Sequence, residues 1–233
     1  MKYRFVLTCA AVICGIWLLR IALTGNLRYD FIVWNIFLAS IPLLTMPVFT
    51  LINHRLKGYA AKIGRLITAL VWLLFLPNAF YILTDFMHLN AQVSVNARHD
   101  TNKYFILYER GDGLYIYDTL LLFAATAFGA YVGGLALFYA YTYFRKKTSS
   151  TGTYMAMAAI MVLCAVGVYI GRFGRWNSWN GITQPHEVIA DFFNNLVTAK
   201  TLGRFLILLI ALLIFQLASL TLVYYQQKKR SPT

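Results

Sequence analysis

An acid and a histidine stand three positions apart in the stretch "LPNAFYILTDFMHL", as Asp85 and His88. Side chains at this spacing share a helix face, so the carboxylate can orient the imidazole as an acid–base pair, or both can bind one metal ion. Asp118, His186 and Glu187 are the residues that would complete a metal site. The chain has no HExxH motif and no second histidine at close spacing, so we expect no metal site. Asp85, His88 and Asp118 are the candidate catalytic residues.

The same stretch carries a row of polar side chains. Asn78, Tyr81, Asp85 and His88 follow one another at intervals of three, four and three residues, which places them along one helical face. Pro77 precedes them, and its missing backbone N–H predicts a kink or break in the helix. Because polar groups are costly in lipid, this row must face protein or a water-filled cleft.

A second polar segment, "GRFGRWNSWN" at 171–180, follows an apolar run. Its arginines are expected to pair with Asp85 or Asp118, because a carboxylate near hydrocarbon needs an opposite charge. Its tryptophans are typical of a membrane–water interface. We therefore predict one polar cluster formed by both segments. The candidate ligand-binding residues of the two segments are Asn78, Arg172, Arg175, Trp176, Asn177 and Trp179.

The composition requires these segments to lie in a membrane protein. Of the 233 residues, 60% are hydrophobic and 12% are charged, whereas soluble domains average about 45–50% and about 25%. Apolar runs of about 20 residues account for the excess. We predict an all-α polytopic helix bundle, one integral membrane domain over 1–233. Its six predicted transmembrane helices are 5–23, 31–52, 66–89, 114–144, 154–170 and 204–225.

Residues 185–199 are too polar for a seventh span. Pro185 suits the first turn of a helix. Apolar side chains then recur at helical spacing, while Glu187 and Asp191 lie elsewhere on the surface of the predicted helix. The pattern predicts an amphipathic helix lying in the membrane interface. A lid packed on the bundle explains the pattern equally well.

The net charge of +13 does not indicate nucleic acid as a partner, because the basic residues cluster in short tracts beside apolar runs. The expected partner is the lipid bilayer. Because successive spans alternate in direction, six spans place both termini on the same side of the membrane. Twelve of the 21 basic residues and none of the eight acidic residues lie on that side. The positive-inside rule therefore assigns it to the cytoplasm. These twelve are Lys2, Arg4, Arg55, Lys57, Lys62, Arg65, Arg145, Lys146, Lys147, Lys228, Lys229 and Arg230.

Three segments together resemble a known family. "LPNAFYILTDFMHL", the pair Tyr117-Asp118 and "GRFGRWNSWN" are similar to the signature segments of a bacterial membrane family catalogued as domain of unknown function 1361. The resemblance spans most of the chain. It implies a multi-span protein of the bacterial cell membrane and supplies no catalytic residues.

Three kinds of function remain open, and the cofactor, if any, is unknown. The outward-facing cluster binds an anionic lipid headgroup or a membrane-protein partner. Alternatively, the protein is a hydrolase or transferase acting on a lipid-linked substrate, with Asp85 or His88 as general base and Arg172 and Arg175 on a phosphate. The third alternative, a small transporter, ranks last, because the inner halves of the spans offer only uncharged polar residues such as Thr and Ser.

The topology is testable by labelling. A cysteine placed at 148–152, between the fourth and fifth predicted spans, should resist a membrane-impermeant maleimide in intact cells, because that connection is cytoplasmic. A control cysteine placed in the connection 171–203 should react. Rapid modification at 148–152 would reverse the assigned orientation.

Overall fold

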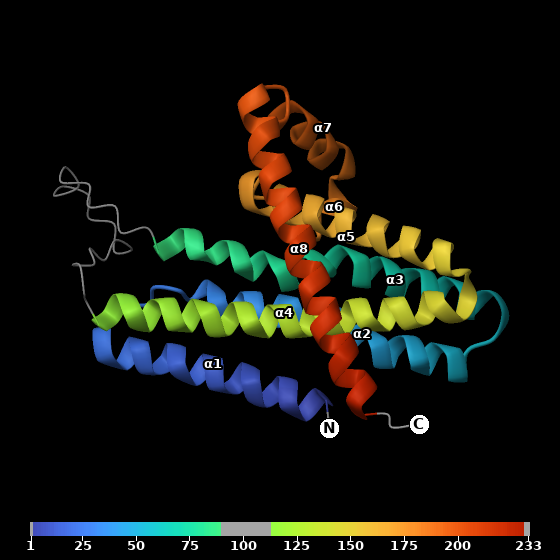
Figure 1. Ribbon diagram of the computed structural model, residues 1–233, viewed down its shortest axis with the longest axis horizontal. Coiled ribbons are helices and arrows are strands. Elements are labelled where there is room, and N and C mark those ends of the chain that lie inside the picture. Colours follow the sequence, from blue (N-terminus) through green and yellow to red (C-terminus); the bar gives the residue numbers. More distant parts are fainter. Residues whose placement is uncertain (1, 90–112, 231–233) are drawn as a thin grey trace.

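The computed structural model describes residues 2–89 and 113–230, and every regular element within them is a helix. Six of these helices are long and apolar enough to cross a membrane, which confirms the predicted bundle. Figure 1 shows their arrangement. The elements are α1 (Lys2–Thr24), α2 (Phe31–Arg55), α3 (Gly58–Tyr81), the 3-10 helix η1 (Ile82–Leu89), α4 (Gly113–Lys147), α5 (Ser150–Phe173), α6 (Asn180–Thr183), α7 (Pro185–Asn195) and α8 (Ala199–Arg230).

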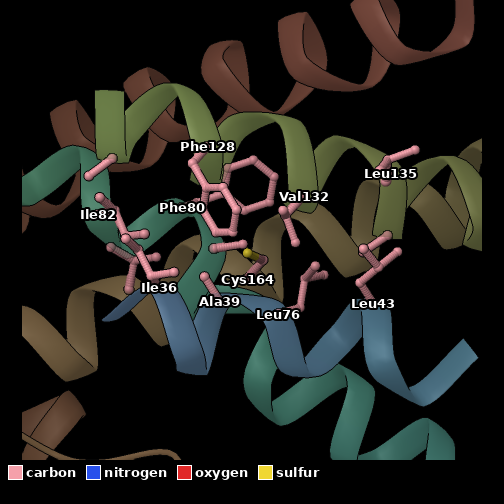
Figure 2. Packing of buried hydrophobic residues seen from close by; sticks show 14 of the residues in the cluster. Ile36, Ala39, Leu43, Leu76, Phe80, Ile82, Phe128, Val132, Leu135 and Cys164 are labelled. Atoms are coloured by element: carbon pink, nitrogen blue, oxygen red, sulfur yellow. The ribbon is translucent and has the colours of Figure 1, made fainter. Parts of the chain in front are cut away.

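Helix α4 occupies the centre of the bundle. It packs against α1, α2, α3, η1, α5 and α8, and α8 crosses over it in Figure 1. The core joins side chains of α2, α3, η1, α4 and α5, and both Phe80 and Phe128 belong to it (Figure 2). The labelled core residues are Ile36, Ala39, Leu43, Leu76, Phe80, Ile82, Phe128, Val132, Leu135 and Cys164.

The third span ends at Leu89 as predicted, but it begins earlier and changes its winding near the end. Helix α3 starts at Gly58, eight residues before the apolar run begins, because a helix continues through residues such as Lys62 whose charges reach water. Pro77 does not break it: the α-helix runs on to Tyr81 and only then tightens into η1. A Cβ at Gly167 of α5 would lie 2.6 Å from the Pro77 ring, so α5 packs directly against the proline.

Small residues let α4 approach α3 closely. A Cβ added at Gly129 would collide with the backbone carbonyl of Ala79, and one added at Gly133 would lie 2.6 Å from the Phe80 ring. Because only glycine fits at both positions, the Gly129-x-x-x-Gly133 spacing is a helix-packing face. This contact fixes the end of α3 and therefore the start of η1.

An ion pair holds α1 on α4. Arg20 and Asp118 are both fully buried, and Nε and Nη2 of the arginine donate to the two carboxylate oxygens at 2.5 and 3.1 Å. Nη1 donates to the Asn26 carbonyl oxygen at 3.1 Å. The two parallel bonds form the bidentate geometry that stabilises such pairs most. The hydroxyl of Tyr117 adds a bond to the Ile16 carbonyl oxygen at 2.5 Å.

The amphipathic helix is present as α7 and ends at Asn195, because a turn separates it from the start of α8 at Ala199. Val188 is buried, and the Phe192 ring packs on Phe205 with centroids 5.6 Å apart. Phe193 is 64% exposed. One edge of the apolar face thus packs on the bundle as a lid does. The other edge, at Phe193, is exposed, and for this edge contact with the membrane interface remains the prediction.

Gly129→Ala tests the contact between α3 and α4. The added methyl group has no space beside the Ala79 carbonyl, so we expect a loss of about 1–3 kcal/mol in the free energy of unfolding, as for other overpacked cores. Gly15→Ala in α1 is the matched control, since nothing lies within 4 Å of its Cβ position. Thermal unfolding in detergent measures both; an equal loss in both variants would contradict the packing argument.

Candidate functional site

A cavity of about 880 Å³ lies between α2, α3, η1 and α5, next to the segment that links α5 to α7. Ligand pockets are typically about 300–1,000 Å³. All four residues of the predicted polar row line it, so the row faces the cavity rather than lipid. The polar and aromatic lining residues are Phe31, Trp34, Asn35, Asn78, Tyr81, Asp85, His88, Arg172, Arg175, Trp176, Asn177 and Ser178.

The ion pair between Asp85 and Arg172 forms the centre of the polar wall. Nη2 of Arg172 donates to Oδ1 of Asp85 at 2.5 Å, and the two side chains are 10% and 1% exposed. The second carboxylate oxygen accepts from Nδ2 of Asn35 at 2.8 Å. Nε of Arg172 donates to the Thr84 hydroxyl at 2.7 Å. The carboxylate is thus compensated by a charge from α5 and an amide from α2.

His88 contacts the same arginine. Its Nε2 lies 3.2 Å from Nη1 of Arg172. Arginine has no acceptor, so Nε2 must accept this bond, and the neutral imidazole carries its proton on Nδ1. The ring packs against Phe31, with centroids 4.7 Å apart, and Arg28 donates to the His88 carbonyl oxygen at 2.7 Å. The imidazole is therefore held in one orientation and one tautomer.

Arg172 also stacks on an aromatic ring. Its guanidinium carbon lies 4.4 Å from the centroid of Tyr81. Stacking of this kind suits arginine because its planar group is weakly hydrated. With three bonds and one stacking contact, Arg172 joins α3, η1 and α5 into one wall.

Arg175 lines the same cavity as Arg172 but differs from it in exposure and in hydrogen bonding. It is exposed, lines the cavity, and has no hydrogen bond or ion pair with any described residue. Its φ of 57° lies in the left-handed region, which is costly for a residue with a Cβ. Strain of this kind persists where the surrounding structure holds the backbone in place. Arg175 is thus a cation at the cavity wall without a protein partner in the described chain.

Hydrogen bonds hold the segment after α5 over the cavity. Nδ2 of Asn78 donates to the Ser178 hydroxyl at 2.9 Å and to the Phe75 carbonyl oxygen at 3.1 Å. The indole N–H of Trp176 donates to Asp191 of α7 at 2.8 Å. These bonds tie the segment to α3 on one side and to α7 on the other.

Seven of the nine candidate residues line this cavity: Asn78, Asp85, His88, Arg172, Arg175, Trp176 and Asn177. Trp179 is 42% exposed and is not part of the lining. Asp118 is also outside it. Its ion-pair partner is Arg20, not Arg172 or Arg175 as expected from the sequence. Asp85 therefore pairs with an arginine of the second segment as expected, whereas Asp118 lies apart from the predicted polar cluster.

Four residues that bind the candidate site residues in the structure were not predicted from the sequence: Arg20, Asn35, Thr84 and Ser178. Arg20 and Asn35 are single polar residues inside apolar runs, and the rule that polar groups in a span need partners would have singled them out. Thr84 and Ser178 stand inside the two polar segments. Their hydroxyls carry no signal that distinguishes them from other serines and threonines of the chain.

The residues considered for a metal site do not meet. His186 is 83% exposed, and its nearest carboxylate oxygen, on Glu187, is 3.7 Å away. Within residues 2–89 and 113–230, no three His, Cys, Asp or Glu side chains converge to hold an ion.

Fold and site together define an integral membrane protein whose apolar helices enclose a polar cavity near one end. A family described as "Protein of unknown function (DUF1361)" matches residues 34–218, and the chain belongs to this family. The matched residues include α3 to α7 and, apart from Phe31, all of the polar and aromatic residues that line the cavity. No curated protein and no solved structure matched the chain.

Single substitutions of the Asp85–Arg172 pair test its role in stability. Asp85→Asn leaves Arg172 largely buried without an opposite charge, and Arg172→Ala leaves the carboxylate alone. Each should lower the free energy of unfolding in detergent by about 3–5 kcal/mol. The double variant Asp85→Asn with Arg172→Met removes both charges and should recover most of that loss. A double variant that loses the sum of both single effects would show that pairing is not the cause.

Proposed function

We propose that the cavity binds the polar end of an anionic lipid at the outer face of a bacterial cell membrane. The observation that carries the proposal is Arg175, a cation held in a strained backbone conformation at the cavity wall without a partner in the described chain. The planar guanidinium of arginine matches a phosphate group, which it can bind through two parallel hydrogen bonds.

The shape of the cavity supports an amphiphile over a small anion. Arg172 lies at its polar end and Leu163 at its apolar end, both on α5. At 1.5 Å per residue the nine intervening steps correspond to about 13 Å. Leu38, Leu74 and Val166 also line the apolar part. A headgroup beside the arginines would therefore place the start of an acyl chain along these aliphatic side chains.

The charge balance supports an anion. Asp85 is compensated by Arg172, and His88 is held as a neutral acceptor, so among the described residues the charge of Arg175 on the polar wall has no counter-charge. Neutral groups that can donate hydrogen bonds line the same cavity, namely the side-chain amide of Asn177 and the hydroxyl of Ser178. This combination of one cation and neutral donors suits a phosphodiester.

Binding is favoured over catalysis by the state of the candidate bases. The carboxylate of Asp85 is ion-paired with Arg172 and only 1% exposed, and Nε2 of His88, the one acceptor nitrogen of the neutral imidazole, already accepts from Arg172. A general base must be accessible to the proton that it removes and must face it with a free lone pair. Transport is less favoured, because the polar lining ends at leucines instead of continuing through the bundle.

The proposed orientation places both termini in the cytoplasm. The positive-inside rule supports it. The alternating course of the spanning helices also supports it, because it brings the start of α1 and the end of α8 to the same side in Figure 1. The cavity then opens toward the outer leaflet, where α3 and α5 end.

Arg175→Gln tests the proposal without disturbing an internal contact. The purified protein should bind phosphatidylglycerol in preference to phosphatidylcholine, and the variant should bind phosphatidylglycerol about tenfold more weakly, as the loss of one charge-assisted bond implies. Arg204→Gln is the matched control, because Arg204 is exposed and does not line the cavity. Native mass spectrometry in detergent measures bound lipid. Equal losses in both variants, or no preference for the anionic lipid, would contradict the proposal.

A further inference from the structure

A second cavity, of about 1,120 Å³, lies at the opposite end of the bundle, between the end of α2, the first half of α3 and the end of α4. Leu73 lines both cavities, so the second one begins about where the first one ends. Its basic lining residues are His54, Arg65 and Lys146, and no carboxylate of the described residues lines it. The end that these residues occupy is therefore basic.

The basic groups of this cavity have no counter-charge in the described chain. Nε of Arg65 donates to the Ala61 carbonyl oxygen at 3.1 Å, which leaves the two terminal nitrogens of the guanidinium for another partner. Lys146 is exposed, and neither it nor Arg65 forms an ion pair with a described residue. Cations gathered around one cavity repel one another, and a bound anion removes that repulsion.

The cavity becomes apolar with depth. His54 stands in the last turn of α2, and Met46 lies eight residues further into the same helix, a distance of about 12 Å along the axis. On α3, Leu73 likewise lies eight residues beyond Arg65, which is also about 12 Å along the helix axis. Charged groups at the mouth and aliphatic groups below them match an amphiphile with an anionic head.

Trp72 provides a further, independent observation. It lines this cavity and is 8% exposed, and its indole N–H has no acceptor among the described residues. A buried donor without an acceptor is destabilising, so such groups are rare in native proteins. An ester or phosphate oxygen of a bound lipid would provide the missing acceptor after a small rotation of the ring.

From these observations we infer that the second cavity is a separate binding site for an acidic phospholipid. Its phosphate lies between Arg65 and Lys146, and an acyl chain follows the wall formed by Met46, Ala69 and Leu73. In the proposed topology this lipid belongs to the cytoplasmic leaflet. The inference does not depend on the ligand of the first cavity, because the charged groups of the two sites are different residues.

The test compares two double variants with the same change in net charge. Arg65→Gln with Lys146→Gln removes the two cations of the cavity, and Lys62→Gln with Lys147→Gln removes two neighbouring cations that do not line it. Both double variants are made in the Arg175→Gln protein, so that lipid bound in the first cavity contributes least to the measured binding. Native mass spectrometry with phosphatidylglycerol should show about tenfold weaker binding in the first double variant and unchanged binding in the second.

A second pair of variants tests the apolar wall. Ala69→Phe fills the cavity below the charges and should also weaken lipid binding, whereas Leu70→Phe, on an exposed position outside the lining, should not. Equal losses in the two double variants would mean that general surface charge holds the lipid, which overturns the site. Full displacement of the lipid by soluble glycerol phosphate would also overturn it, because a free anion and not an amphiphile would then be the ligand. If the lipid binds here while Arg175→Gln alone has no effect, only the proposal for the first cavity fails.

Discussion

An ionised carboxylate inside an apolar bundle is stable only beside a positive charge with matching hydrogen bonds. Asp118 and Asp85 meet this requirement with arginines that are 98 and 87 residues away in the sequence. The first pair attaches α1 to α4, and the second attaches η1 to α5. The two ion pairs thus select which helices are neighbours, a choice that apolar surfaces make poorly in lipid because any apolar face packs against any other.

Close packing at glycines fixes α3 between its neighbouring helices. Glycines on α4 and α5 bring the backbones of these helices against α3, Gly129 at Ala79 and Gly167 at Pro77. With α3 fixed on both sides, the row from Asn78 to His88 faces α2 and α5 across a cavity. The polar wall exists because the helix that carries it cannot rotate away from its neighbours.

Much of this was predictable from the sequence. The six spans follow from the length of the apolar runs, the packing face of α4 from the spacing of Gly129 and Gly133, and the row of polar residues from helical periodicity. The partner of Asp118 was not predictable. Spacing shows that a buried charge needs a partner, but the choice between Arg20 and Arg172 depends on which helices are adjacent in space.

The winding of η1 has a mechanical consequence. Three residues turn a 3-10 helix through about 360° but an α-helix through only about 300°. Asp85 and His88 therefore stand directly above one another only while η1 keeps its tighter winding. Rewinding the segment as an α-helix would swing the imidazole sideways by about 60° and detach it from Arg172 while the carboxylate stays. The 3-10 winding of these eight residues thus decides whether the central arginine of the cavity contacts both side chains or only the carboxylate.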